Sequence, residues 1–247
     1  MPHLLLSTGR ALLGPGRTFS PSGLTGLQSW LKTSVLALSD STLIATFTDN
    51  SGQSHEVSQS TDSKKFTYKA NILNGQPIAR MDGGDIETSS WSPTLGTGDF
   101  YIIVAAKVNS ATGAKQMLFG DLQNSGGFNG IYLGAEETTG KWKAAVRSGG
   151  SETSIVQGSA TTGVWKLIEM SRASGTLELV INGSSVGTAT ASGTCTGEGF
   201  TVGEARTGDG GEYFTGDMAE LCFYSIVPNS TEKDNLRTYY NSLYAIY

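Results

Sequence analysis

Acidic side chains in two glycine-rich segments are the first residues of this chain that could do chemistry. Asp82 and Asp85 lie on either side of two glycines, and Asp209 and Glu212 lie in a second glycine-rich segment at 204–217. Hard cations such as Ca²⁺ bind the carboxylate and carbonyl oxygens of loops. We therefore take these four residues as candidate calcium ligands. Neither segment matches an EF-hand loop, and solvated acidic turns are the alternative.

Four aromatic residues in Ser/Gly-rich or acidic segments could instead bind a sugar. They are Trp91, Phe128, Tyr213 and Phe214. A ring displayed on a loop can stack on the apolar face of a sugar, with amides and carboxylates completing the site. The alternative is that each ring folds back and closes one end of the domain. Three further tryptophans lie in strand-like patterns and are expected in the core: Trp30, Trp142 and Trp165.

Histidines and cysteines are too few to suggest a nucleophile or a zinc site. His3 and His55 are the only histidines, and no Ser–His–acid relay is apparent around them. Cys195 and Cys222 are far apart, whereas structural zinc sites use closely spaced pairs. We expect two unpaired thiols, in keeping with synthesis in the cytoplasm.

The acidic residues near the carboxyl end do not suggest an acid–base pair. Asp217 and Glu220 are three positions apart. In a regular strand, side chains three apart project from opposite faces, so these two carboxylates would not face each other across a cleft. We predict no catalytic residues in the chain and no cofactor other than the candidate Ca²⁺.

Charge and hydropathy exclude several classes of partner. The net charge is -5 and the isoelectric point is about 5.1, with no cluster of Lys and Arg. This pattern disfavours nucleic acid and anionic membranes. No apolar run approaches the roughly 20 residues that span a bilayer, and the leucines near the start are too few for a signal peptide.

Residues 1–22 are predicted to form an N-terminal arm ahead of one domain at 23–247. Prolines and glycines interrupt every periodic pattern in the arm, yet it carries two apolar clusters. The clusters consist of Leu4, Leu5, Leu6, Leu12 and Leu13. They either pack against the chain's own domain or dock on other subunits or proteins.

The elements expected beyond the arm are strands and one helix. Runs rich in β-branched and aromatic residues alternate with turn signals, which is typical of an all-β sandwich. The expected strands are 42–48, 78–82, 100–108, 116–120, 130–135, 141–147, 165–171, 177–181, 200–202 and 218–224. Asn182 and Gly183 predict a type I′ hairpin turn. From Asn229 the apolar period changes to that of a helix, with Glu232 completing an N-terminal capping signal.

Several short motifs resemble the laminin-G-like branch of the concanavalin A-like lectin superfamily. The resemblance covers residues 24–247. Its first motifs are Gly-Leu-Gln-Ser-Trp-Leu at 26–31, Thr-Asp-Asn-Ser-Gly at 48–52 and Asn-Ile-Leu-Asn-Gly-Gln-Pro-Ile-Ala-Arg-Met-Asp-Gly at 71–83. The later motifs are the 164–183 hairpin and Gly-Asp-Met-Ala-Glu-Leu at 216–221. Met81 stands where the family usually has Phe, and Thr33 where it commonly has Asp. The resemblance implies an antiparallel two-sheet jelly roll with one carboxyl-terminal helix.

The resemblance also frames what the chain is expected to do. The glucanases of the superfamily carry an E-x-D-x-x-E pattern, which does not occur here. We expect a structural or adhesion protein of a bacteriophage particle, in the head or the tail, that docks through its arm and binds cell-surface polysaccharide through loops. The alternative is a bacterial carbohydrate-binding module, and a glycoside hydrolase ranks last.

Overall fold

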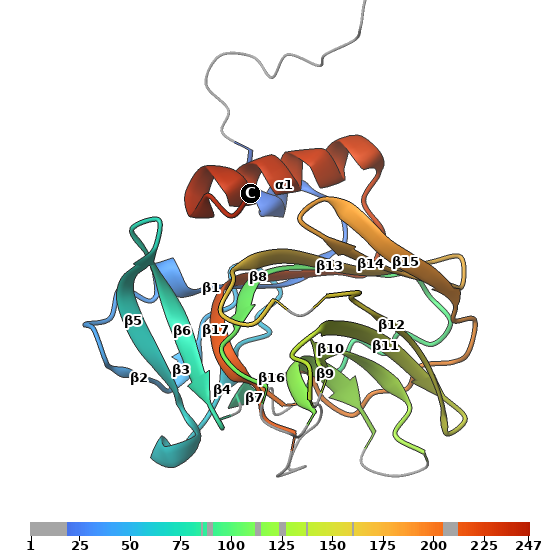
Figure 1. Cartoon of the computed structure of the whole chain (residues 1–247), viewed down its shortest axis with the longest axis horizontal. Coiled ribbons are helices and arrows are strands. Elements are labelled where there is room, and N and C mark those ends of the chain that lie inside the picture. The colour runs from blue at the N-terminus through green and yellow to red at the C-terminus, as the bar shows by residue number, and fades with distance from the viewer. Residues whose placement is uncertain are drawn as a thin grey trace, which may run out of the picture.

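Two antiparallel sheets packed face to face form the body of the molecule (Figure 1). The computed structural model describes residues 19–84, 86–87, 91–111, 115–123, 127–136, 138–159, 161–204 and 212–247. Over these residues the first sheet has nine strands. They are β1 (Leu27–Lys32), β2 (Leu43–Ile44), β5 (Phe66–Leu73), β6 (Gln76–Asp82), β8 (Phe100–Val108), β13 (Lys166–Ala173), β14 (Thr176–Ile181), β15 (Ser184–Thr190) and β17 (Thr215–Tyr224).

The second sheet contains eight strands over the same described residues. They are β3 (Thr46–Phe47), β4 (Val57–Ser58), β7 (Ile86–Glu87), β9 (Gln116–Leu122), β10 (Gly130–Ala135), β11 (Trp142–Ser148), β12 (Ser151–Val156) and β16 (Thr201–Val202). Their order across the sheet is β12-β11-β10-β9-β16-β7-β4-β3. The predicted two-sheet sandwich is therefore confirmed.

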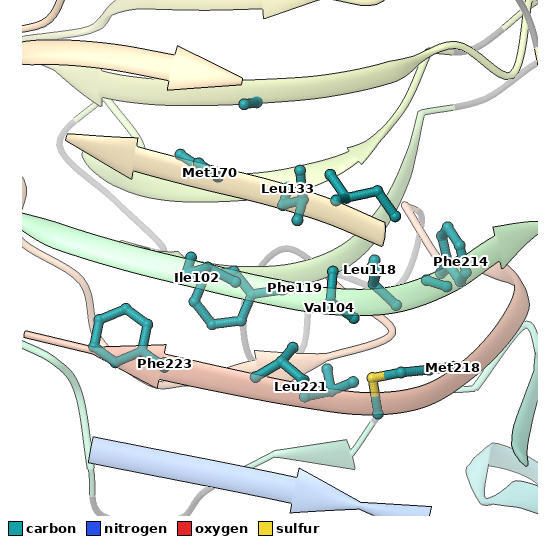
Figure 2. Close-up of a cluster of buried hydrophobic side chains, with 14 of the residues drawn as sticks. Ile102, Val104, Leu118, Phe119, Leu133, Met170, Phe214, Met218, Leu221 and Phe223 are labelled. Carbon is teal, nitrogen blue, oxygen red and sulfur yellow. The ribbon is translucent and has the colours of Figure 1, made fainter. Parts of the chain in front are cut away.

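The main hydrophobic core lies between the sheets (Figure 2). In regular stretches alternate residues point inward, because successive side chains of a strand project to opposite faces. Irregular pairing breaks this alternation in β9, where the adjacent Leu118 and Phe119 both lie in the core. The core residues labelled in Figure 2 are Ile102, Val104, Leu118, Phe119, Leu133, Met170, Phe214, Met218, Leu221 and Phe223. The two long central strands β8 and β17 supply half of these labelled side chains.

A single long helix covers the outer face of the first sheet (Figure 1). Helix α1 (Ser230–Tyr244) begins with a capping box in which Asn229 and Glu232 exchange side-chain-to-backbone hydrogen bonds. Its buried residues Leu236, Tyr240 and Tyr244 pack on the outward side chains of β8 and β17. The predicted closing helix is thus confirmed. Among the described residues, no helix is long and apolar enough to cross a membrane.

Short helical turns and tight loops connect the strands. The 3₁₀ turns are η1 (Pro21–Gly23), η2 (Thr33–Val35) and η3 (Asp62–Lys64). The predicted hairpin turn is confirmed, since Asn182 and Gly183 have φ angles of 51° and 73°. Asp49 organises the loop after β3 by accepting hydrogen bonds from the backbone of Trp30, Ser51 and His55.

The expected strands at 100–108 and 130–135 match β8 and β10 residue for residue. The expected strand at 42–48 is wrong as a single element. Its first half is β2, which pairs with β5 in the first sheet, and its second half is β3, which pairs with β4 in the second. The chain therefore passes from one sheet to the other near Ala45, which the continuous β-prone sequence does not signal. Strands β4, β5, β7 and β12 were not expected.

A β-bulge in β17 overturns one expectation about Asp217 and Glu220. In the pairing with β8, Met218 lies opposite Ala106 and Glu220 opposite Ala105, so Ala219 is the extra residue. The bulge reverses the alternation, and both carboxylates project from the face that carries α1. The two carboxylates have different partners on that face. Asp217 forms ion pairs with Arg80 and Lys107. Glu220 accepts hydrogen bonds from Trp30, Tyr239 and Tyr244.

Candidate functional site

Two adjoining hollows lie on the outer face of the second sheet, over β9, β10 and β11. Their volumes are about 190 Å³ and 270 Å³, and both are lined by Lys115, Met117 and Tyr132. We call the combined surface the Tyr132 groove. The smaller hollow is completed by Ala135, Glu136, Thr138 and Lys143, and the larger by Leu122, Phe128, Arg147 and Glu212. Strands β9, β10 and β11, which carry the groove, belong to the sheet that α1 does not cover (Figure 1).

Small residues surround Tyr132, and its two glycine neighbours let β9 come close, because a Cβ at Gly130 or Gly134 would clash with the β9 backbone. In β10, Gly130 and Gly134 flank Tyr132 on the same face, because they are two positions away on either side. Across the sheet, Tyr132 lies opposite Gly120 of β9 and Ala145 of β11. The Tyr132 side chain packs with Met117, Leu122 and Ala145 in a small buried cluster separate from the main core.

A carboxylate on the edge strand β12, which β11 separates from β10, fixes the Tyr132 ring. Tyr132 donates its hydroxyl hydrogen to Glu152 Oε2 at 2.9 Å, and Lys143 Nζ lies 2.7 Å from Glu152 Oε1. Burial by itself would raise the pKa of Glu152, but the hydrogen bonds from Lys143 and Tyr132 outweigh burial and lower it. The Lys143 ammonium also lies 5.7 Å from the centre of the Tyr132 ring. Tyr132 and Lys143 thus form a floor of the groove that is held from behind by Glu152.

Phe128 provides an aromatic surface at one end of the groove. Its side chain is 36% exposed, and its backbone is in the left-handed region with a φ of 56°. The Arg147 guanidinium lies 5.6 Å from the centre of the Phe128 ring, a cation–π arrangement. Lys115 and Glu212 form a loose ion pair of 3.9 Å beside the same hollow. The sequence singled out Phe128 and Glu212 separately, and the fold brings them to one surface.

The other aromatic candidates are placed differently. Trp91 stacks on His55 with ring centres 3.9 Å apart and also contacts Phe200, so its ring closes one end of the sandwich. Phe214 is completely buried and packs beside Trp142, which makes it a core residue instead of a surface for stacking. Tyr213 is half-buried, and the Lys64 ammonium lies 5.8 Å from its ring centre.

The expected core tryptophans differ in burial. Trp142 is completely buried between the sheets. Trp30 and Trp165 are half-buried and pack against the cluster under α1. In the structure Trp30 thus lies on the helix side of the first sheet, and the next residue, Leu31, enters the core between the sheets.

The candidate calcium ligands are described only in part. Asp82 is exposed at the end of β6, and Glu212 lines the Tyr132 groove. Asp85 and Asp209 lie outside the described residues, as do the arm residues Leu4, Leu5, Leu6, Leu12 and Leu13. In the part of the chain that the structure describes, no three His, Cys, Asp or Glu side chains cluster as metal ligands would.

Several buried polar groups lie outside the groove. Both cysteines are buried free thiols, as expected, with Cys195 accepting a hydrogen bond from Arg172. Asp121 is buried at the end of β9, where it accepts hydrogen bonds from Ser92 and the backbone of Gly199. Burial raises the pKa of Asp121 to about 6 despite these hydrogen bonds.

The fold is a lectin-like jelly roll of two sheets. Helix α1 covers the outer face of the first sheet, and the Tyr132 groove lies on the outer face of the second. In agreement, the family described as the concanavalin A-like lectin/glucanases superfamily matches residues 93–232, more than half of the chain. The chain therefore belongs to this superfamily. No curated protein matches the chain in sequence.

Solved structures show the same fold at low sequence identity. The binding domain of Paraclostridial Mosquitocidal Protein 1 is 14% identical with a TM-score of 0.57, over 87% of this chain and 53% of that one. The botulinum neurotoxin type C structure is 14% identical with a TM-score of 0.61, over 88% and 51%. This chain thus spans about half the length of these toxin chains. Domain 4 of AbnA, an arabinanase from Geobacillus stearothermophilus, is 14% identical with a TM-score of 0.61, over 86% of this chain and 98% of that domain.

Proposed function

We propose that this chain is a carbohydrate-binding module and that the Tyr132 groove is its binding surface. The observation that carries the proposal is the exposed Phe128 ring beside the charged side chains of Lys115 and Arg147, all lining one hollow. Sugar sites combine an aromatic face with a few polar groups that fix the orientation of the ligand. The Tyr132 ring is held by its hydrogen bond to Glu152, and such preorganisation limits the conformational entropy lost on binding.

Structural relatives lend support to this choice. The AbnA domain was solved in complex with arabinotriose, and the botulinum neurotoxin type C work concerns two ganglioside molecules. At 14% identity these relatives share the fold and not a demonstrated site. These matches favour the alternative expectation of a carbohydrate-binding module, and they lend no support to a role in a phage particle.

The proposal is for binding without catalysis. A glycosidase needs a carboxylic acid with a raised pKa as proton donor, facing a second carboxylate. In the groove, Glu152 has the opposite property, because Lys143 and Tyr132 lower its pKa. On the helix side, Asp217 and Glu220 are occupied by Arg80 and by Tyr244 respectively. The chemistry of these carboxylates favours a structural role.

The experiment is a glycan array followed by titration calorimetry with the best oligosaccharide, using the full chain. We expect dissociation constants between micromolar and millimolar. Phe128→Ala should weaken binding at least about tenfold, a loss of roughly 1.4 kcal/mol. Tyr247→Ala is the matched control, since Tyr247 is an aromatic residue with 52% exposure at the carboxyl end, and this variant should bind as the wild type does.

Two results would contradict the proposal. One is an array without any bound glycan. The other is binding that is equally strong in wild type and Phe128→Ala, which would move the site away from the groove.

A further inference from the structure

The Tyr132 groove contains a guanidinium group that its protein neighbours leave partly unsatisfied. The Nε atom of Arg147 is buried and has no hydrogen-bond partner among the described residues. Its Nη1 atom lies 3.7 Å from Glu152 Oε2, which is beyond hydrogen-bonding distance. A buried donor without an acceptor costs free energy. Nε itself is shielded from solvent, so a ligand would meet the exposed part of the Arg147 side chain, which is 22% exposed.

Glu152 is already engaged by other donors. Its Oε1 atom lies 2.7 Å from Lys143 Nζ, and its Oε2 atom accepts the Tyr132 hydroxyl at 2.9 Å. Both of these contacts are shorter than the one to Arg147. The positive charge of Arg147 is therefore incompletely neutralised within the groove.

A second cation faces the same hollow. Lys115 lies 3.9 Å from Glu212, which is too long for a hydrogen bond. Lys115, Arg147 and Phe128 all line the larger hollow, whose volume is about 270 Å³. This hollow is smaller than the pockets that hold drug-sized ligands, so it suits one compact anionic group on a larger chain.

We propose that the larger hollow selects sugars that carry a carboxylate, such as a hexuronic or a sialic acid. The Arg147 guanidinium would donate to the carboxylate, because the planar fork of donors matches its two oxygens. Lys115 would add a second positive charge, and Phe128 would pack on the apolar face of the sugar ring. Since the whole chain has a net charge of -5, long-range attraction does not explain such a preference, and local contacts must. The inference rests on the proposed function and names the ligand class of the same site.

The test compares acidic sugars with neutral counterparts by titration calorimetry on the full chain at pH 7. The first pair is trigalacturonate and its full methyl ester, and the second is 3′-sialyllactose and lactose. We expect the acidic member of at least one pair to bind at least about tenfold more tightly, and the pair that responds identifies the acid. Arg147→Gln should reduce that preference to about twofold or less. Arg147→Lys should restore only part of it, because an ammonium lacks the planar fork.

Control variants separate this inference from general effects of charge and folding. Lys69→Gln removes one positive charge from β5 in the other sheet and should keep the full preference. Thermal melting and near-ultraviolet circular dichroism of each variant establish that it is folded.

The outcomes also distinguish the inference from the proposed function. If acid and ester bind equally, while Phe128→Ala still weakens binding, the carboxylate preference is refuted and the carbohydrate-binding function stands. If none of these four sugars binds while the array finds another glycan, the carboxylate preference is refuted and the carbohydrate-binding function stands. If the array also shows no bound glycan, both proposals fail. A preference that persists unchanged in Arg147→Gln would also refute the role given to Arg147.

Discussion

Tyr132 and Glu152 are joined across an intervening strand. The Tyr132 hydroxyl of β10 donates to Glu152 Oε2 of β12 at 2.9 Å, although β11 lies between these two strands. Tyr132 and Ala145 are directly paired and belong to one cluster, and the small Ala145 side chain leaves space for the ring to reach β12. One phenol thereby ties three strands together and forms the floor of the groove.

Removing that hydroxyl should cost stability and change the ionisation of Glu152. In Tyr132→Phe the ring remains but Glu152 loses a donor, so the free energy of unfolding should fall by about 1 kcal/mol. The pKa of Glu152 should rise, because the Tyr132 hydrogen bond helps to lower it. Urea denaturation and an NMR titration of the Glu152 side chain measure the two effects. An unchanged Glu152 pKa would contradict the hydrogen bond.

The buried Asp121 should make stability depend on pH in an unusual direction. Its pKa in the folded protein is about 6, above the ordinary value of 3.8, because burial disfavours the charged form. Its contribution to stability is therefore complete below pH 3.8 and decreases as the pH rises through 6. The full difference is on the order of 3 kcal/mol.

Asp121→Asn isolates this effect. The amide keeps an acceptor for the backbone N–H of Gly199 but carries no charge. Relative to wild type, the variant should gain free energy of unfolding between pH 4 and pH 7, as measured by urea denaturation at a series of pH values. Parallel pH profiles for the two proteins would show that Asp121 is not buried as a titrating group.

The ion pairs of Asp217 should make the free energy of unfolding rise with pH, which is opposite to the effect of Asp121. Burial would raise the pKa of Asp217, but hydrogen bonds from Arg80 and Lys107 outweigh it and lower the pKa. Asp217→Asn should therefore reduce the free energy of unfolding by about 2–3 kcal/mol at pH 7, with the loss shrinking as the pH falls below 4.

Asp234→Asn is the matched control for Asp217→Asn. Asp234 pairs with Arg237 on the exposed surface of α1, where an ion pair contributes less than about 1 kcal/mol. Chemical denaturation of both variants at pH 7 provides the comparison. Equal losses in the two variants would argue against a special role for the buried pair.

The capping box at the start of α1 should contribute to the stability of the protein. Asn229→Ala removes the side chain that accepts the backbone N–H of Glu232 and should lower the free energy of unfolding by about 1 kcal/mol. Thr231→Ala, an exposed change in the same turn, should have little effect. Thermal and urea denaturation measure both. A loss in Thr231→Ala as large as that in Asn229→Ala would contradict the capping role.

The sequence by itself determined the elements that depend on local chemistry. Runs rich in β-branched and aromatic residues marked β8 and β10. The Asn182–Gly183 pair marked a hairpin turn, and Asn229 with Glu232 marked the start of α1. These signals are readable because each depends on residues that are neighbours along the chain.

Only the tertiary structure decided which of these elements meet and which face a side chain takes. The groove gathers Lys115, Phe128, Tyr132 and Arg147 from different segments, and alternation within a strand does not reveal which strands lie side by side. Because of one bulged residue in β17, Glu220 projects from the same face as Asp217. Phe214 packs against Trp142 in the core and is not exposed at the surface. Strand register and core packing are set by contacts between distant residues, and for that physical reason the candidate site emerged from the fold.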